Sequence, residues 1–281
     1  MNRTELLKRV GNIMLRTPSL WIITLIGVLI EAVVGYALRE PSLGIVLIQT
    51  AVVFIVTAFT SGALIGLVQL TAKQEPVSIG AGLQSGVRCL PALLIVSLIL
   101  AVPVWIALSA YFYSTGGSIN EVILSGMGQP NGLQISDLLN NLPALLSLVG
   151  VIFVTSILAH AISVGTERAI VVDQQAILAA FKQGYTLLRT KIVDFITWAL
   201  ILAVAILSIQ LITGLILSQL IGAPNLEQSF LGGILVTLNV ITGTIITVLI
   251  STVWTLVYLE WQTPTPVEDT PDEKRITKKK G

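Results

Sequence analysis

The stretch FITWALILAVAILSIQLITGLILSQLIGAPNL at residues 195–226 contains no Asp, Glu, Lys or Arg. About 20 consecutive apolar residues in a helix cross a hydrocarbon core that is roughly 30 Å thick. The apolar residues are continuous, whereas a membrane β-strand alternates apolar and polar residues. A helix also satisfies its own backbone hydrogen bonds in lipid. The stretch therefore predicts a transmembrane helix over residues 193–220.

Four further stretches without acidic or basic residues lie at 41–72, 89–120, 138–166 and 228–259. A shorter one at 17–30 is interrupted by Glu31, and reading through Glu31 to Leu38 gives one more span. We therefore expect an all-α polytopic membrane protein with six transmembrane helices, at about 19–38, 44–70, 90–112, 143–165, 193–220 and 231–259.

The composition of the whole chain agrees with this fold class. Of its 281 residues, 54% are hydrophobic and 11% are charged, whereas an average soluble domain carries about 25% charged residues. So few charges cannot coat a soluble globule of this size, which excludes a water-soluble enzyme. The net charge of +1 gives no general attraction to nucleic acid.

The Lys and Arg residues predict the orientation. If the N-terminus lies in the cytoplasm, every basic residue except Arg39 falls on the cytoplasmic side, as the positive-inside rule requires. We therefore expect both termini in the cytoplasm of a prokaryotic cell, with the chain in its plasma membrane. The first span followed by Gly35-Tyr36-Ala37 also resembles a cleaved signal peptide, but removing it would leave five spans and spoil the charge pattern.

The chain shows signs of a threefold internal repeat. A moderately polar, helix-compatible segment precedes the first, third and fifth spans, at 4–16, 77–88 and 174–189, and these segments end in Arg16, Arg88 and Arg189. The sequence GNIMLRT at 11–17 is similar to GYTLLRT at 184–190. Apolar residues recur at helical spacing in the third segment, which predicts amphipathic helices lying in the membrane interface.

This pattern divides residues 1–261 of the transmembrane domain into parallel units at 1–72, 73–165 and 166–260, each an interfacial helix followed by a transmembrane hairpin. The second helix of each hairpin carries small or polar residues four apart, which allow helices to pack closely in lipid. We therefore expect these second helices to form the inner set. The stripes consist of Ala58, Gly62 and Gly66; Thr155, Ala159 and Ser163; and Asn239, Gly243, Thr247 and Ser251.

Two segments outside the spans have their own character. The loop 113–142 contains Gly, Asn and Pro residues, and we interpret it as irregular, with a connector, a lid or a contact for a partner as its alternatives. The tail 262–281 is polar, with three prolines and a charge pattern that runs from acidic to basic. It predicts a disordered cytoplasmic tail, for which a weak attachment to anionic lipid and a purely solvated role both stay open.

The sequence contains few chemical motifs. It has no phosphate-binding loop, zinc-protease motif, nucleophile elbow or Cys-x-x-Cys pair, and it holds one His and one Cys. We therefore predict no metal, no other cofactor and no enzymatic activity.

Two ionisable residues within the predicted spans are the main functional candidates. A carboxylate in hydrocarbon is costly, so Glu31 would handle a proton, a cation or a polar substrate, or else be a protonated carboxyl that bonds to a neighbouring helix, with Gln49 or Gln210 as partners by depth. His160 would titrate near neutrality or simply form a buried hydrogen bond. By depth the two residues belong to opposite leaflets, and we do not expect them to form a direct pair.

Charged residues after the fourth span complete the candidate set. Glu167, Arg168 and Asp173 predict a local salt bridge or cap that fixes the turn into the third interfacial segment. That segment carries Lys182, Gly184 and Arg189, and Gly11 and Arg16 take the corresponding places in the first. Trp21, Trp254, Tyr258 and Trp261 fall near the inner boundary of the membrane, which predicts an aromatic belt.

The residues ERAIVVD at 167–173, followed by AILAAFKQGY at 176–185 and by Leu188-Arg189, resemble a pattern in a six-helix prokaryotic integral membrane family of unknown function. That family is similar to the membrane domain found beside some glycerophosphoryl diester phosphodiesterases. The resemblance covers about 25 residues, and this chain has no counterpart of the phosphodiesterase domain. It implies a membrane role and no reaction.

Three functions stay open. The first is a non-enzymatic membrane module, either an envelope scaffold or a module that binds lipid or a partner, with anionic lipids and another membrane protein as candidate partners. The second is a permease subunit of an ATP-binding-cassette transporter with an ATPase partner, because Ala179-Ala180 and Gly184 fit part of the coupling-loop pattern of such permeases. The third is a proton-coupled carrier that uses Glu31.

Overall fold

The computed structural model describes residues 3–37, 43–114, 142–221 and 228–262. Within these ranges it contains eight helices and no strand. They are α1 (Arg3–Arg16), α2 (Pro18–Ala37), α3 (Leu43–Ala72), α4 (Ile79–Ser114), α7 (Leu142–Val171), α8 (Ile177–Thr190), α9 (Ile192–Ile221) and α10 (Gln228–Gln262). Most of the predicted loop 113–142 and of the tail 262–281 lie outside the described residues.

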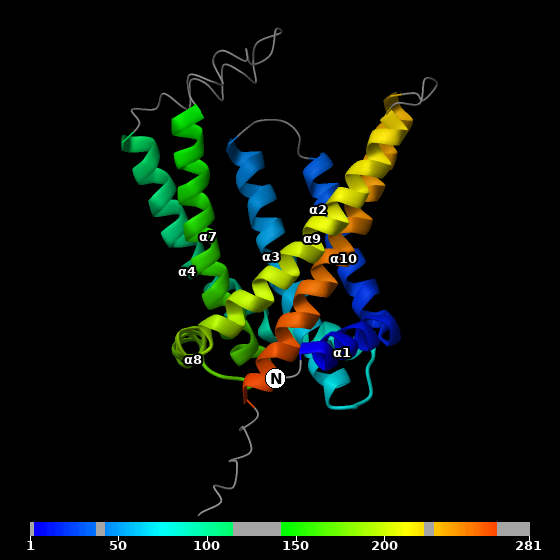
Figure 1. Ribbon diagram of the computed structural model, residues 1–281, viewed down its shortest axis with the longest axis vertical. Coiled ribbons are helices and arrows are strands. Elements are labelled where there is room, and N and C mark those ends of the chain that lie inside the picture. Colours follow the sequence, from blue (N-terminus) through cyan, green and yellow to red (C-terminus); the bar gives the residue numbers. More distant parts are fainter. Residues whose placement is uncertain (1–2, 38–42, 115–141, 222–227, 263–281) are drawn as a thin grey trace, which may run out of the picture.

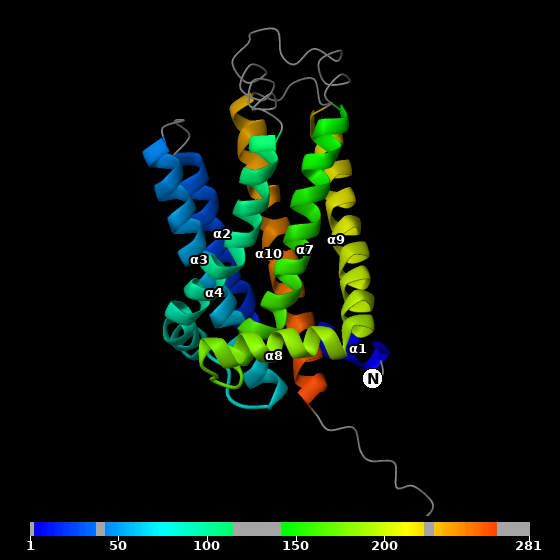
Figure 2. The same cartoon turned by 90° about the vertical axis from the view of Figure 1, so that its left-hand side faces the viewer.

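Six long helices rise from a common base, and two short helices lie across it (Figures 1 and 2). The short helices are α1 and α8, and the first described residues and the end of α10 lie at the same base. Away from the base, α4 and α7 diverge from α9 and α10 in the view of Figure 1, and α2 and α3 lie to one side of the other long helices in the view of Figure 2.

Five stretches of the described chain are long and apolar enough to cross a membrane: Pro18–Gly35, Leu47–Ala72, Ile79–Ala107, Ile192–Ser218 and Gly232–Gln262. This confirms a multi-span helical membrane protein. The expected span at 143–165 falls in α7, which is not among these five. The count of six therefore stays a prediction that depends on α7.

Two of the three predicted interfacial segments are separate helices, and the middle one is not. Pro18, which has no N–H and restricts the residue before it, separates α1 from α2, and Lys191 separates α8 from α9. Residues 79–88 instead form the beginning of α4, which runs on through Pro91 and Pro103. The sequence predicted a separate interfacial helix at 77–88. This is wrong, because the helix that begins at Ile79 continues past Pro91 and Pro103 without a break.

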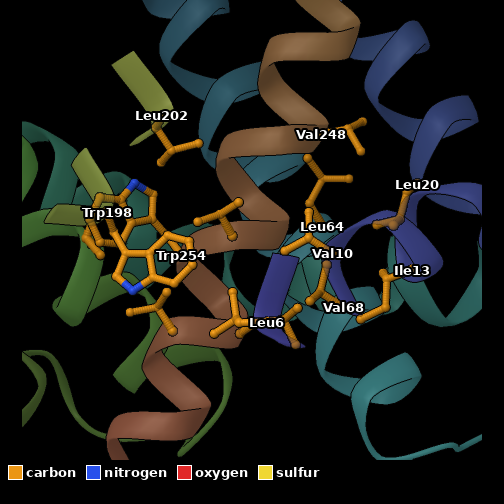
Figure 3. Packing of buried hydrophobic residues seen from close by; sticks show 14 of the residues in the cluster. Leu6, Val10, Ile13, Leu20, Leu64, Val68, Trp198, Leu202, Val248 and Trp254 are labelled. Carbon is orange, nitrogen blue, oxygen red and sulfur yellow. The ribbon is translucent and has the colours of Figure 1, made fainter. Parts of the chain in front are cut away.

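The hydrophobic core lies near the base. In α1, Leu6, Val10 and Ile13 are buried at helical spacing, as expected for an amphipathic helix. They join a cluster with residues of α2, α3, α9 and α10 (Figure 3). Within it, the rings of Phe195 and Trp254 stack with centroids 4.7 Å apart. Trp254 and Tyr258 are buried, so their assignment to an aromatic belt is wrong.

Glycines set how closely α3 packs against α4. A Cβ on Gly86 would lie 2.9 Å from the backbone oxygen of Phe59, and one on Gly62 would lie 3.0 Å from a methyl group of Leu93. The side chain of Ser85 occupies the space beside Gly66 and donates a hydrogen bond to the carbonyl of Gly62 at 3.0 Å. The predicted stripe of α3 thus packs against the first turns of α4.

Glycines also set how closely α7 and α8 cross. A Cβ on Gly165 would lie 2.7 Å from the Cα of Gly184, and one on Gly184 would lie 2.8 Å from the backbone nitrogen of Thr166. Tyr185, which the sequence placed on the apolar face of this segment, is 58% exposed. Gly184 and Ala180 are the residues that face inward.

The other stripes are less uniform. Thr155, Ala159 and Ser163 on α7 are partly buried, whereas Asn239 on α10 is exposed. Gly243 lies beside Val28 of α2. Half of the span in α3 is buried but only 6% of the span in α9, which fits the expectation that α3 belongs to the inner set. The span in α10 is 22% buried against 28% in α2, so the inner position of α10 relative to α2 is not borne out.

The two glycines of the similar heptapeptides offer a matched test. Gly184→Ala forces a Cβ into backbone atoms, and overpacking of this kind typically destabilises by about 1–3 kcal/mol. Gly11 has open space around it, so Gly11→Ala gains up to about 1 kcal/mol of helix propensity. We expect thermal unfolding in detergent to show a lower Tm for Gly184→Ala only. An equal Tm for the two variants would contradict this packing.

Candidate functional site

A polar cavity of about 310 Å³ lies inside the bundle, between α2, α3, α4, α7 and α10. Four ionisable residues line it: Glu31 from α2, and His160, Glu167 and Arg168 from α7. Seven Ser and Thr side chains also line it, and they are Thr57, Thr60, Ser61, Ser97, Ser163, Thr247 and Ser251. Such a density of polar groups within apolar helices marks a candidate functional site.

Glu31 meets α3 across the cavity. Its Oε1 accepts a hydrogen bond of 2.9 Å from the hydroxyl of Thr57, and it forms no ion pair within the described part of the chain. The sequence suggested Gln49 or Gln210 as the partner of Glu31, but its partner in this hydrogen bond is Thr57. Glu31 thus brings to the cavity a carboxyl group that no cation in the described chain pairs with.

Glu167 and Arg168 form the expected local ion pair, but within α7 rather than after it. Arg168 Nη1 lies 3.6 Å from Glu167 Oε2, and the same carboxylate oxygen accepts a hydrogen bond of 2.9 Å from Ser61. The Arg168 side chain is 5% exposed. The span predicted to end at 165 continues to Val171, which brings this pair into the cavity wall.

The cavity still holds unpaired polar atoms. Arg168 Nη1 donates to the carbonyl of Val164 at 3.2 Å, while its Nε is buried without a partner. The hydroxyl of Ser251 is likewise buried and without a partner. Buried polar groups are normally satisfied, so two residues that line the cavity carry hydrogen-bonding capacity that the described chain does not use.

His160 lines the same cavity as Glu31, although the sequence placed the two residues in opposite leaflets. Its backbone oxygen accepts a hydrogen bond from Ser163 at 2.9 Å, and its side chain is exposed. The structure shows no direct contact between His160 and Glu31, as expected. One cavity therefore extends to both residues.

Asp173 fixes the end of α7 to α10. Its Oδ2 accepts hydrogen bonds from the Tyr258 hydroxyl at 2.5 Å, from Gln262 at 2.6 Å and from Gln183 of α8 at 3.2 Å. Gln183 also donates to the Tyr258 hydroxyl at 2.7 Å. The sequence predicted only a local role for Asp173, because partners 85 and 89 residues away leave no local signal.

The basic residues of the interfacial segments lie outside this cavity. Arg16 on α1 and both Lys182 and Arg189 on α8 are exposed. Arg88 belongs to a different cavity at the base. The sequence missed Thr57 and Ser61, although hydroxyls at positions 57 and 61 of an apolar helix share one face and could have signalled the site. It named Ser251 only as part of a packing stripe.

Removing the Tyr258 hydroxyl tests the connection between Asp173 and α10. Tyr258→Phe takes one of three donors from the partly buried Asp173, and an intramolecular hydrogen bond of this kind contributes about 1 kcal/mol. We expect faster hydrogen exchange in α8 and in the last turns of α10, measured by mass spectrometry. Tyr185→Phe is the matched control because Tyr185 is exposed; the same acceleration in both variants would rule out the connection.

No family model, curated protein or solved structure matches this chain.

Proposed function

We propose that the chain is a non-enzymatic membrane carrier that binds a small cation, a proton included, in the cavity beside Glu31. The observation that carries the proposal is the cavity itself, in which two carboxylates, a guanidinium, an imidazole and seven hydroxyls line one space within the bundle. A scaffold has no need of such groups in its interior, where charge is costly.

The charge of the cavity favours a cation over an anion. Arg168 and Glu167 neutralise each other as an ion pair, so an ionised Glu31 would give the cavity one net negative charge when His160 is neutral. Hydroxyl and carboxylate oxygens are ligands that hard cations prefer, and a cation that enters restores neutrality. The free hydroxyl of Ser251 adds a further acceptor.

The proposal includes the orientation and organisation predicted from the sequence: six spans with α7 as the fourth, both termini in the cytoplasm, and three parallel units at 1–72, 73–165 and 166–260. The two similar glycine crossings, α3 with α4 and α7 with α8, support the units. Membership in the six-helix family suggested by residues 167–189 stays part of the proposal, as does a prokaryotic plasma membrane.

A permease subunit with an ATPase partner has weaker support. Ala180 and Gly184, which fit part of the coupling-loop pattern, are buried toward α7 and its neighbours. Packing within the chain is sufficient to explain these small residues. The exposed residues of α8 would have to carry any contact with an ATPase.

Flux through reconstituted vesicles tests the carrier. The probes are Na⁺, methylammonium and H⁺, the last followed with a trapped pH-sensitive dye. We expect the wild-type chain to carry at least one probe faster than empty vesicles, and Glu31→Gln to slow that flux about tenfold or more, since the substitution removes the unpaired charge. Glu5→Gln is the control, because Glu5 lies exposed on α1.

Two results would contradict this function: no flux above empty vesicles with any of the three probes, or equal flux in Glu31→Gln and the wild type. Thermal unfolding of each variant in detergent shows whether it is folded. The separate result of a slowed flux in Glu5→Gln would point to surface charge rather than to the cavity.

Cysteine labelling tests the topology. In a Cys89→Ala background, Ser125→Cys is expected to react with an impermeant maleimide added to intact cells, and Glu75→Cys only after the membrane is opened. Labelling of both positions in intact cells would contradict the single span proposed between Glu75 and Ser125.

A further inference from the structure

A second cavity, of about 470 Å³, lies at the base of the bundle and belongs to neither Glu31 nor His160. Its walls come from the last turns of α3, the first turns of α4, the end of α7 and the turn toward α8. Leu70, Ala92 and Ile170 give it an apolar side, and Arg88 is the one charged residue among those that line it.

Arg88 is held in place by a neutral partner. Its Nη2 donates a hydrogen bond of 2.7 Å to the side-chain oxygen of Gln174, and it forms no ion pair within the described residues. Asp173, the acid next to Gln174, accepts its hydrogen bonds from Tyr258, Gln262 and Gln183 instead. The positive charge of Arg88 therefore faces the cavity without an opposite charge from these neighbours.

Gln174 itself adopts an unusual backbone conformation. Its φ of 54° lies in the left-handed region, which a non-glycine residue adopts only when its surroundings fix it. The carbonyl of Ala169 accepts a hydrogen bond of 3.1 Å from the following residue, Gln175. This turn sets the Gln174 amide beside Arg88. Both residues are exposed, and their hydrogen bond holds the guanidinium beside the turn.

The rest of the lining supplies neutral hydrogen-bonding groups. Gln69, Gln84 and Gln175 add amides to the cavity wall, and of these Gln69 and Gln175 already donate within the chain, to the Val172 carbonyl and to Gln183. Gln84 is exposed. A fixed guanidinium with amide donors around it matches a phosphate group, which accepts paired N–H bonds from arginine.

We propose that this cavity binds a phosphate group, presented either by an anionic phospholipid headgroup or by a soluble phosphate ester, with Arg88 as its main ligand. The apolar side formed by Leu70, Ala92 and Ile170 would accommodate the first carbons of a lipid chain. The cavity lies at the base of the bundle, where the helices α1 and α8 lie (Figure 2).

Native mass spectrometry of the full chain in detergent tests the site with three probes: dioleoyl phosphatidylglycerol, inorganic phosphate, and dioleoylglycerol, which has the acyl chains but no phosphate. We expect Arg88→Gln to weaken binding of the phosphate-bearing probe about tenfold or more, as the loss of a charge-assisted hydrogen bond implies. Arg88→Lys keeps the charge and weakens binding less. Arg16→Gln, an exposed arginine on α1, leaves it unchanged.

The pattern across probes identifies the source of the phosphate. Binding of phosphatidylglycerol that depends on Arg88 assigns a lipid headgroup, and binding of inorganic phosphate alone with the same dependence assigns a soluble ester. Equal weakening in Arg16→Gln, binding of dioleoylglycerol as tight as that of phosphatidylglycerol, or unchanged binding in Arg88→Gln overturns the proposal. If Arg88→Gln does not fold, Gln84→Glu adds a repelling charge to the wall and should also weaken binding.

Discussion

The close approach of backbones at glycine is the constraint on which both cavities depend. Gly165 of α7 and Gly184 of α8 leave no room for a Cβ, and Gly86 meets the backbone of α3 at Phe59 in the same way. In lipid, helices associate through packing rather than through a hydrophobic force between them. These contacts therefore hold α7 and α4 against their neighbours, and α7 carries three of the four ionisable residues of the inner cavity.

Fixing α7 also decides the state of its charges. Arg168 is nearly enclosed, and a buried cation is tolerated only with a partner and with hydrogen bonds for its remaining donors. Glu167 and the Val164 carbonyl supply part of this, Ser61 donates to Glu167, and the Nε atom of Arg168 is left without a partner. Because Glu167 and Arg168 pair with each other, Glu31 is the carboxyl group of the cavity that has no cation beside it in the described chain.

The sequence predicted the helices well, because the hydrocarbon core requires long apolar runs and allows charges only at their ends. The six expected ranges fall within a few residues of helices, apart from the extension of α4 to Ile79 and of α7 to Val171. Both extensions cross charged residues, Arg88 and the pair at 167–168, which the sequence placed outside the spans. These charged residues lie where the helices border cavities: Arg88 lines the cavity at the base, and Glu167 and Arg168 line the inner cavity.

Contacts between distant segments were not predictable in the same way. Hydrogen bonds join Glu31 to Thr57, Ser61 to Glu167 and Asp173 to Tyr258. Each depends on how the two helices are rotated about their axes, which an apolar pattern does not specify. Tyr258 illustrates the difficulty: its position near the end of a span indicates an aromatic belt, but it is buried against α8. The rotation of α10 about its axis decides whether Tyr258 faces the membrane interface or packs against α8.

Glycines at matching positions of the proposed repeat have different surroundings. Gly184 is enclosed by α7, whereas the matching Gly11 has open space, although α1 itself packs against α10. The inner helix of each unit thus touches the base segment of the next: α3 with α4, α7 with α8, and α10 with α1. The buried face of α1 consists of Leu6, Val10 and Ile13, whereas the other two contacts are made at glycine. The three junctions therefore follow the same order along the chain but are formed by different kinds of residue.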